Sequence, residues 1–306
     1  MNTASHPFHG ILLILAAGLV LASHDGIAKY LALSHSLILV VWARYLSQST
    51  VMLLLFGPRR GLSIVRTRHP VLQLIRGLCL VAVSLLFVSA LRHIPIGEAT
   101  AVLFLAPLFI TGLSATLLRE RVSRGQWGAV ILGMLGVLVI VRPGSALFTP
   151  AALLPLGAAF CLAVFMLLTR RLSESDDPVT CNFLSSLVGS LLMSLLVPFY
   201  WETPDLHDGL LLAMVGGVAM SGHLLLSHAY RYASAATLAP FTYSQIVFAV
   251  LVGAVAFGHV PDGVALLGIA IVIASGVLSV WVQRRAALPP AAGHQGQGSE
   301  AEIGRS

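Results

Sequence analysis

The sequence has few charged residues and a single lysine, Lys29. Only 10% of its 306 residues are Asp, Glu, Lys or Arg, whereas 57% are hydrophobic and the mean hydropathy is +0.91. Soluble globular proteins carry about 25% charged residues, so this composition excludes an ordinary soluble domain. The three cysteines form no CxxC pair, which excludes a disulfide framework and a cysteine-based zinc site.

The motifs of common nucleotide-dependent and hydrolytic enzymes are also missing. The sequence contains no GxxxxGK, HExxH or GxSxG. We therefore expect no enzymatic activity, no bound metal and no cofactor. We also expect no ATP-driven pump, because the connectors are too short to hold a nucleotide-binding domain.

Long apolar runs dominate what is present. A run of about 20 apolar residues is long enough to cross a hydrocarbon core roughly 30 Å thick. The sequence predicts an all-α membrane protein with ten transmembrane helices. Their approximate ranges are 10–32, 37–56, 70–91, 97–118, 125–142, 150–169, 181–200, 209–229, 236–257 and 263–283.

Arginine is concentrated in the connectors on one side of this ten-span arrangement. The opposite connectors hold at most Lys29, Arg92 and Arg142. Cytoplasmic loops carry the excess of Lys and Arg, so we expect both termini in the cytoplasm of a bacterium and the spans in its inner membrane. The net charge of +6 then reflects topology and gives no reason to expect nucleic-acid binding. The arginine-rich side holds Arg59, Arg60, Arg66, Arg68, Arg119, Arg121, Arg124, Arg170, Arg171, Arg231, Arg284, Arg285 and Arg305.

The chain contains a weak internal repeat. Five spans separate equivalent points, so the second half crosses the membrane in the opposite sense, as in the inverted-topology repeats of many secondary transporters. At an offset of 139, Ala90, Arg92, Phe109 and Ala115 match Ala229, Arg231, Phe248 and Ala254. At an offset of 140, Gly128, Ile131, Gly136, Val137 and Leu138 match Gly268, Ile271, Gly276, Val277 and Leu278.

Two stretches carry a family resemblance. ALRHIPIGEATAVLFLAPLFITGLSATLLRERVSRGQWGAVILGMLGVLVIVRPG (residues 90–144) resembles an EamA domain of the drug/metabolite transporter superfamily, and AYRYASAATLAPFTYSQIVFAVLVGAVAFGHVPDGVALLGIAIVIASGVL (229–278) resembles its second copy. The resemblance implies a ten-helix carrier of amino acids, nucleosides, S-adenosylmethionine-like metabolites or drugs. We expect one five-helix repeat over 9–144 and another over 149–283, a short cytoplasmic N-terminus over 1–8, and a disordered cytoplasmic tail over 284–306.

The first half also resembles a bacterial subset of this family. That subset has an Asp and a Lys four residues apart in the first helix, an Arg in the second helix and another near the start of the third. In this chain these residues are Asp25, Lys29, Arg44 and Arg76. One departure is clear, because the family often has a Glu after the ninth helix and this chain has His259 in FGHVPD.

The charges inside the first two spans form the main candidate site. Charged side chains are costly at membrane depth unless they face a wet cavity or a partner. Asp25 and Lys29 share one helical face and can pair, and Arg44 is expected at the same depth in the outer half. Such a cluster either binds an ionised substrate or a proton, or is a structural ion pair with Lys29 extended to the headgroups. We expect Arg76 to extend to the inner surface in the same way.

Other polar residues are weaker candidates. Glu98 is expected either to cap the fourth helix or to carry a proton, and His24 can titrate near neutral pH. His223 is expected in the eighth helix, where a packing role competes with a functional one. Tyr243 and Gln245 follow Pro240 in a polar stretch that is typical of cavity-lining helices. We expect helix bends at Pro107, Pro155 and Pro240.

We therefore predict a secondary transporter that moves a small polar metabolite by alternating access. The favoured substrate is an amino acid or a related zwitterion, moved by proton-linked export. One alternative is an importer or exchanger of a larger metabolite such as S-adenosylmethionine, and another is a membrane scaffold that transports nothing. The expected partners are the metabolite, the lipid bilayer and protons, without nucleic acid. Substrate identity, direction, coupling ion and oligomeric state stay open.

Overall fold

The computed structural model describes residues 7–116, 123–142, 148–172, 175–232 and 235–287, which form helices and short connectors with no strand among them. The α-helices of the first half are α1 (Pro7–Ser34), α2 (Leu37–Arg60), α3 (Pro70–His93), α4 (Ile96–Leu103), α5 (Ala106–Thr116) and α6 (Arg124–Ile140). Those of the second half are α7 (Leu153–Leu172), α8 (Pro178–Leu196), α9 (Leu206–Tyr232), α10 (Ala235–Thr242), α11 (Ser244–Phe257) and α12 (Gly263–Ala287). Short 3₁₀ turns are η1 (Gly61–Val65), η2 (Pro150–Ala152) and η3 (Val197–Phe199).

The prediction of an all-α membrane protein is confirmed. Within the described ranges, nine segments are long and apolar enough to cross a membrane, and α6 is a shorter apolar helix. Together they account for the ten predicted spans. Helix α1 already begins at Pro7 and α12 continues to Ala287, so helix extends into both predicted tails. The rest of those tails, 1–6 and 288–306, lies outside the described residues.

Two of the predicted spans are not single helices. The range 97–118 contains α4 and α5, separated by a turn at Phe104 and Leu105, and the range 236–257 contains α10 and α11, separated at Tyr243. Pro107 lies in the first turn of α5, and Pro240 lies inside α10 three residues before the break. Pro155 lies in the first turn of α7, which runs without a break. Proline is tolerated in a first turn because no intrahelical hydrogen bond is lost there.

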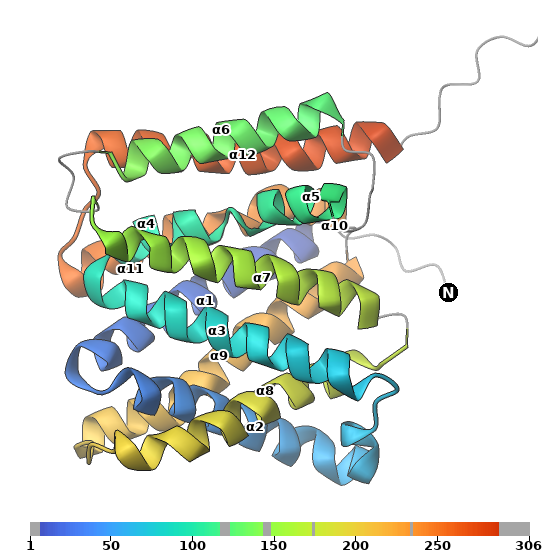
Figure 1. Cartoon of the computed structure of the whole chain (residues 1–306), viewed down its shortest axis with the longest axis vertical. Coiled ribbons are helices and arrows are strands. Elements are labelled where there is room, and N and C mark those ends of the chain that lie inside the picture. The colour runs from blue at the N-terminus through green and yellow to red at the C-terminus, as the bar shows by residue number, and fades with distance from the viewer. Residues whose placement is uncertain (1–6, 117–122, 143–147, 173–174, 233–234, 288–306) are drawn as a thin grey trace, which may run out of the picture.

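The two halves interlock with two-fold character, as expected of an inverted repeat. Helix α3 of the first half packs against α7 of the second, and α9 of the second packs against α1 of the first. The last helices, α6 and α12, lie side by side at one edge of the bundle, and α2 and α8 pack together at the opposite edge (Figure 1). Each half therefore buries its apolar surface largely against the other half.

The turns before the second helices of the two halves are built alike. Ser36 is the N-cap of α2 and accepts a hydrogen bond from the Leu39 N–H, and Asp177 is the N-cap of α8 and accepts one from the Val179 N–H. Both caps satisfy backbone donors that a helix start leaves free. These turns lie at opposite ends of the bundle, called here the α1–α2 end and the α2–α3 end.

Helix α9 approaches α2 closely at Gly216. A Cβ atom built there would lie 2.1 Å from the Arg44 carbonyl oxygen and 2.3 Å from Ser47 Oγ. The Gly216 N–H donates to Ser47 Oγ at 3.0 Å. Small residues allow such backbone contact between membrane helices, and this contact sets the position of α9 beside Arg44.

We expect Gly216→Ala to destabilise the protein, because α9 must move away from α2 to accept a methyl group. Overpacking of this kind costs about 1–3 kcal/mol. The matched control is Gly217→Ala, because nothing lies within 4 Å of a Cβ at Gly217. Thermal unfolding in detergent should show a lower midpoint for Gly216→Ala only. Equal midpoints for the two variants would contradict the close approach.

Candidate functional site

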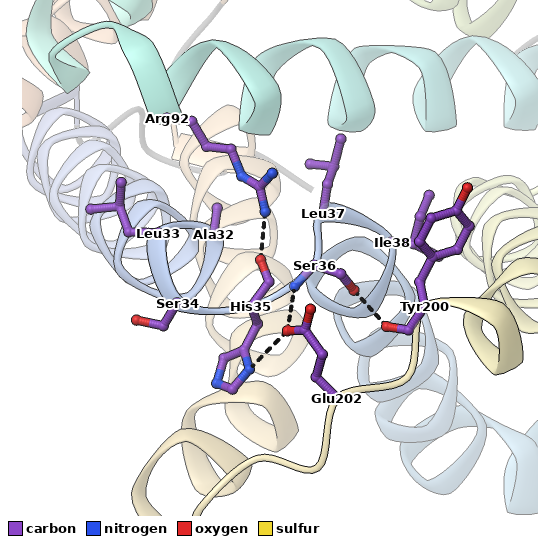
Figure 2. A pocket seen from close by; sticks show the side chains of 10 residues that line it. All are labelled: Ala32, Leu33, Ser34, His35, Ser36, Leu37, Ile38, Arg92, Tyr200 and Glu202. Carbon is purple, nitrogen blue, oxygen red and sulfur yellow. Dashed lines mark hydrogen bonds and ion pairs between the residues drawn. The ribbon is translucent and has the colours of Figure 1, made fainter.

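An open cavity of about 650 Å³ lies at the α1–α2 end. It surrounds the turn between α1 and α2, with Arg92 of α3 on one side and Tyr200 and Glu202 on the other (Figure 2). The lining residues are Ala32, Leu33, Ser34, His35, Ser36, Leu37, Ile38, Arg92, Tyr200 and Glu202. Charges of both signs therefore border this cavity.

One peptide group in this turn is held from both sides. Arg92 Nη2 donates to the His35 carbonyl oxygen, and the Ser36 N–H donates to Glu202 Oε2 at 2.9 Å (Figure 2). The Ser36 hydroxyl donates to the Tyr200 carbonyl oxygen at 2.8 Å. The α1–α2 turn of the first half is thereby tied to the segment that joins α8 and α9 in the second.

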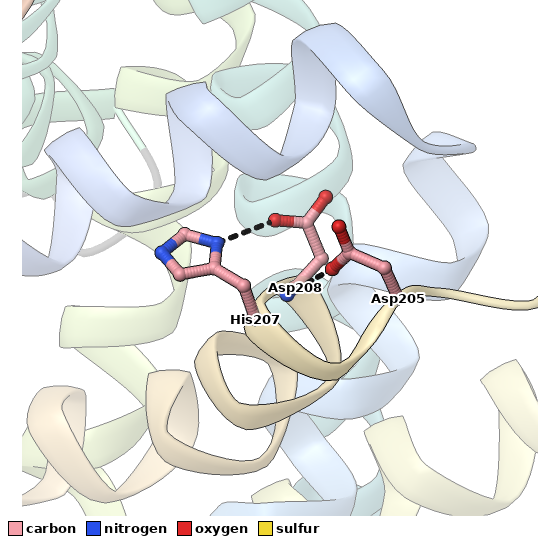
Figure 3. Close-up of side chains that lie close together, drawn as sticks. All are labelled: Asp205, His207 and Asp208. Carbon is pink, nitrogen blue, oxygen red and sulfur yellow. Dashed lines mark hydrogen bonds and ion pairs between the residues drawn. The ribbon is translucent and has the colours of Figure 1, made fainter.

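Asp205, His207 and Asp208 cluster at the start of α9 (Figure 3). Asp205 Oδ1 accepts the Asp208 N–H at 2.7 Å, as a helix cap does, and His207 Nδ1 contacts Asp208 Oδ1 at 3.0 Å. The other carboxylate oxygen, Asp208 Oδ2, contacts His35 Nε2 at 2.8 Å. These contacts occupy both oxygens of Asp208 and explain the cluster without a metal ion.

Deeper in the bundle, Asp25 pairs with its neighbour in α1. His24 Nδ1 lies 3.0 Å from Asp25 Oδ1, and both side chains are buried. Because the carboxylate accepts from Nδ1, Nε2 of a neutral His24 is left as an acceptor. This Nε2 atom is buried and has no hydrogen-bond partner among the described residues. The ion pair expected between Asp25 and Lys29 is not found in the described structure.

Arg44 reaches across from α2 to α3. Its Nη1 donates to Ser84 Oγ at 2.8 Å, and the Tyr45 hydroxyl lies 2.6 Å from the same Ser84 oxygen. No carboxylate lies within ion-pair distance of Arg44 in the described part of the chain, and its buried Nε has no hydrogen-bond partner there. A half-buried guanidinium of this kind has spare capacity to bind an anionic or hydrogen-bonding ligand.

His223 of α9 completes a group around Arg44. Arg44 interacts electrostatically with both His24 and His223, so side chains from α1, α2 and α9 come together here. The close packing of α9 supports this arrangement, because Gly216 touches the Arg44 backbone and Gly222 touches Leu21 of α1. His223 is exposed although its neighbour His24 is buried. We call His24, Asp25, Arg44 and His223 the interior polar group.

Lys29 belongs to a second group nearer the α1–α2 end. Its Nζ donates to the Ile94 carbonyl oxygen at 2.9 Å and lies 5.4 Å from the centre of the Phe257 ring. Its electrostatic partner is Glu98 of α4. Glu98 is buried; its Oε1 contacts His259 Nε2 at 3.1 Å, and its Oε2 has no partner among the described residues. The single charged cluster predicted from sequence is therefore two groups, and His259 was missed as the partner of Glu98.

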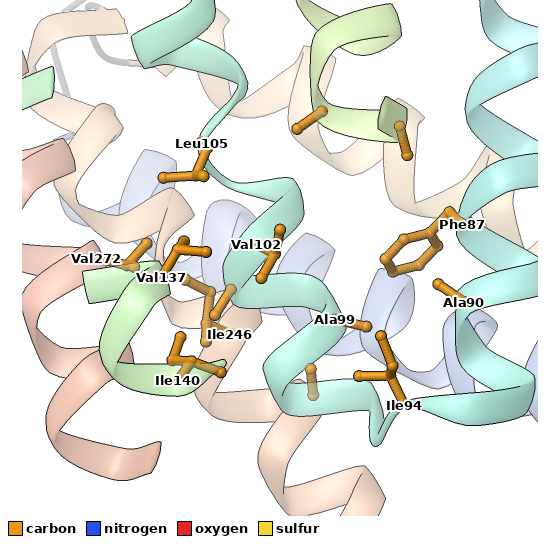
Figure 4. Packing of buried hydrophobic residues seen from close by; sticks show 14 of the residues in the cluster. Phe87, Ala90, Ile94, Ala99, Val102, Leu105, Val137, Ile140, Ile246 and Val272 are labelled. Carbon is orange, nitrogen blue, oxygen red and sulfur yellow. The ribbon is translucent and has the colours of Figure 1, made fainter. Parts of the chain in front are cut away.

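The two helix breaks meet in the core. The Phe104 ring at the α4–α5 break lies 5.3 Å from the Tyr243 ring at the α10–α11 break, with 55° between their planes. A Cβ at Gly276 of α12 would lie 1.8 Å from the Tyr243 hydroxyl, so Tyr243 fills a space that Gly276 leaves. Figure 4 shows Leu105 in the turn between α4 and α5, near Val137 and Val272.

The rest of the polar stretch at the second break faces α1. A Cβ at Gly18 would lie 3.2 Å from Ser244 Oγ and 3.4 Å from the Gln245 backbone nitrogen. Ser244 Oγ is buried without a hydrogen-bond partner in the described ranges, and the Gln245 side chain is half-buried. These atoms add unused hydrogen-bonding capacity beside the break.

Arg76 does not extend to the surface, so that prediction was wrong. The residue is 1% exposed, and its guanidinium donates to Thr169 Oγ1, the Cys181 carbonyl oxygen and Ser185 Oγ at 2.6–2.7 Å. It also lies 4.4 Å from the centre of the Phe165 ring. These contacts tie α3 to α7 and α8, and they give Arg76 a structural role.

Asp176 organises the α2–α3 end. Its carboxylate accepts hydrogen bonds from the Thr67 hydroxyl, from Gln73 Nε2 at 2.8 Å and from the Arg68 N–H at 3.2 Å. Burial raises the pKa of this carboxyl group, but the hydrogen bonds outweigh burial and hold the pKa below its usual value. Nearby, Arg60 pairs with Asp177 at 2.7 Å. The first and second halves are therefore tied at this end as well.

Interlocked inverted halves, broken helices and incompletely paired charges in the interior are typical of one class of protein, the membrane transporter. A model of the EamA-like transporter family matches residues 8–142 and 149–281. The chain belongs to this family, as the sequence resemblance predicted. It is thus a multi-pass membrane transporter and not an enzyme.

Proteins similar to this chain are named as transporters of different metabolites. The chain is 32% identical to a riboflavin transporter of Vibrio cholerae, covering 90% of this chain and 94% of that protein. It is 25% identical to an S-adenosylmethionine uptake transporter of Rickettsia conorii, covering 87% and 90%. It is 26% identical to a pseudopaline exporter of Pseudomonas aeruginosa, covering 88% and 95%. A solved crystal structure with 22% identity shares the fold, with a TM-score of 0.60 over 91% of this chain and 97% of that one.

We expect Arg76→Lys to lower the free energy of unfolding by about 1–3 kcal/mol, because one ammonium group cannot replace the guanidinium at three acceptors. The matched control is Arg66→Lys, an exposed arginine at the same end of the bundle. Thermal or denaturant unfolding in detergent measures the difference. A loss of stability of the same size in both variants would show that the contacts of Arg76 contribute little.

We expect Asp176→Asn to lower stability at neutral pH by an amount that disappears in acid. A carboxyl group whose pKa is lowered by folding stabilises the fold above its usual pKa, and this contribution is lost as pH falls through the lowered value. Unfolding midpoints of the variant and the wild type should therefore begin to approach each other below about pH 4 and coincide only below the lowered pKa. A gap that is constant across pH would argue against the charged hydrogen-bond acceptor.

Proposed function

We propose that the protein is a secondary transporter of the bacterial inner membrane for a metabolite that joins a planar heteroaromatic ring to a polar chain. The observation that carries this proposal is Arg44, a cationic side chain inside the bundle without a carboxylate partner in the described structure. The unpartnered His24 Nε2 and the exposed His223 lie beside it. Retaining such groups at membrane depth is costly unless a ligand or water uses them.

The aromatic pair at the helix breaks suits the ring of such a substrate. Phe104 and Tyr243 come from equivalent breaks in the two halves and touch each other. A planar ring can stack on an aromatic side chain, and Phe104 is the partly buried member of the pair, with Tyr243 packed behind it. Breaks in transporter helices also place free backbone groups near substrate. We therefore assign ring recognition to Phe104 and recognition of the polar chain to the interior polar group.

The relatives support a substrate larger than a simple amino acid. Riboflavin and S-adenosylmethionine, the substrates in the names of two relatives, both carry a heteroaromatic ring joined to a hydroxylated, sugar-derived group. Similarity to these relatives does not determine the direction of transport, because one relative is named for uptake and another for export. Uptake of a ring-bearing metabolite is the first candidate, with riboflavin and S-adenosylmethionine as the first compounds to test.

Proton-linked export of an amino acid or related zwitterion is the second candidate. It is favoured by Glu98, a buried carboxyl group with one unpartnered oxygen that contacts His259 and lies near Lys29. A buried carboxyl group beside a histidine can carry a proton. A membrane scaffold that transports nothing has less support, because it would leave the unpartnered atoms around Arg44 without a function.

The arginine distribution supports an orientation with both termini in the cytoplasm. Helices α2, α7 and α9 carry arginines in their last turns at the α2–α3 end. By the positive-inside rule this end is cytoplasmic, and the α1–α2 end with its open cavity faces the periplasm. The interior polar group would then open to each side in turn.

The test is uptake by purified protein in proteoliposomes, using labelled riboflavin, S-adenosylmethionine and amino acids. We expect at least one ring-bearing compound to enter, and Arg44→Gln to reduce its entry by about tenfold or more, the value of a charged hydrogen bond. The control is Arg66→Gln, reconstituted at the same density. If only amino acids move, in response to a proton gradient and not in Glu98→Gln, the second candidate holds. No movement of any compound would contradict both.

A further inference from the structure

His35 and Asp176 occupy equivalent positions in the two halves. Each directly precedes the N-cap of the second helix of its half, Ser36 for α2 and Asp177 for α8. Each also contacts the start of the third helix of the other half: His35 contacts Asp208 of α9, and Asp176 contacts Gln73 of α3. The inverted repeat therefore places one such contact between the halves at each end of the bundle. We call the contacts of His35 and those of Asp176 the two latches.

The two latches differ in chemistry. Asp176 accepts hydrogen bonds from a hydroxyl, an amide side chain and a backbone N–H, none of which gains or loses a proton near neutral pH. Both ring nitrogens of His35 face carboxylates instead, with Nε2 2.8 Å from Asp208 Oδ2 and Nδ1 3.6 Å from Glu202 Oε2. A titratable ring forms the contact itself only at His35; at the other end, the exposed His69 interacts with Asp176 electrostatically.

The geometry at His35 presents a carboxylate oxygen to each ring nitrogen. A neutral imidazole has one N–H and one lone pair, whereas an imidazolium donates from both nitrogens. In the neutral form with Nε2–H directed at Asp208, the lone pair of Nδ1 faces the Glu202 carboxylate. Consistent with that, Nδ1 is buried and makes no hydrogen bond among the described residues. When Nδ1 binds a proton, the repulsion between its lone pair and the Glu202 carboxylate is replaced by attraction.

We propose that His35 is a proton-binding site that locks the α1–α2 end when it is protonated. The protonated His35 ring joins the α1–α2 turn of the first half to Glu202 and Asp208 of the second. Opening this end separates those segments and must break both contacts. Protonation at this face therefore favours the state in which the end is closed, whereas the three hydrogen bonds that Asp176 accepts at the other end require no change of protonation.

Several other charged or titratable groups surround His35. Arg92 of α3 donates to the His35 carbonyl oxygen and opposes an added positive charge. His207 shares Asp208 with His35, and its side chain is 67% exposed. Tyr30 of α1 interacts with Asp208, and Asp205 caps α9. The two carboxylates that face the ring, Glu202 and Asp208, thus favour protonation, whereas Arg92 opposes it and His207 shares Asp208.

The inference rests on the proposed alternating access, but its test does not need flux. Spin labels are placed on Leu33 of α1 and Leu206 of α9, which are 56% and 82% exposed, after replacement of the three native cysteines. Pulsed dipolar spectroscopy in detergent then gives the distance distribution between the two helices. We expect a short-distance population near about pH 5 and a longer one that grows towards pH 8, with a ratio change of about tenfold.

Variants separate His35 from its neighbours. His35→Gln keeps a donor for Asp208 but cannot be protonated, so its distances should not vary with pH. The matched control His93→Gln removes an exposed histidine at the same end and should retain the wild-type response. Asp208→Asn should favour the longer distance at both pH values. Glu202→Gln removes the partly exposed second carboxylate and should weaken the response, which gives a further check if a core variant folds poorly.

A wild-type protein whose distances ignore pH would overturn the proposal. So would a His35→Gln variant that responds like the wild type, since the proton would then bind elsewhere, for example at His207. Failure of the proposed function looks different. In that case no tested compound moves across proteoliposomes, yet the pH-dependent distances and their loss in His35→Gln persist.

Discussion

The structure depends on one constraint: the hydrocarbon interior of a membrane offers no hydrogen bonds, so polar groups inside it need protein partners. Helices satisfy the backbone, and Arg76 shows how a buried charge is satisfied, with acceptors on α7 and α8 and an aromatic ring beneath it. The exceptions are therefore informative. His24 Nε2, Arg44 Nε and Ser244 Oγ are buried without partners in the described ranges, as are Glu98 Oε2 and Thr100 Oγ1. These five lie on helices that surround the interior polar group and the helix breaks, where a substrate or water would supply the missing bonds. The other two such atoms, His35 Nδ1 and Gln73 Oε1, lie in the contacts at the two ends of the bundle.

The inverted repeat explains why the breaks, the latches and the close helix contacts occur in pairs. Equivalent breaks bring Phe104 and Tyr243 together between the halves. Equivalent turns place His35 at one end and Asp176 at the other, each bound to the opposite half. Two similar ends around one site are what alternating access requires, because each end can close while the other opens. The chemical difference between His35 and Asp176 then allows the two ends to respond differently to acid.

Hydropathy, arginine placement and the weak repeat were enough to predict the ten spans and the two inverted halves. The reason is that the thickness of the hydrocarbon core fixes how many consecutive apolar residues a spanning helix needs. Side-chain partners were not predictable in the same way. Adjacent residues on a helix point about 100° apart, which argued against a contact between His24 and Asp25, yet flexible side chains bring their atoms to 3.0 Å. Spacing suggested that Lys29 pairs with Asp25, but tertiary packing places Ile94 and Glu98 nearer. His259 was visible only as a departure from the family pattern, and its contact with Glu98 required the fold. Residues 117–122 and the end of the predicted tail lie outside the described structure.

The most direct test of the account asks whether the interior polar group is reached from both faces in turn. His223→Cys, in a protein without its native cysteines, is labelled in sealed vesicles with a thiol reagent that cannot cross the membrane. The account predicts labelling from each face in separate experiments, and a transported compound should change the balance between the two faces. Labelling from neither face, or labelling that no transported compound alters, would contradict a substrate site beside Arg44.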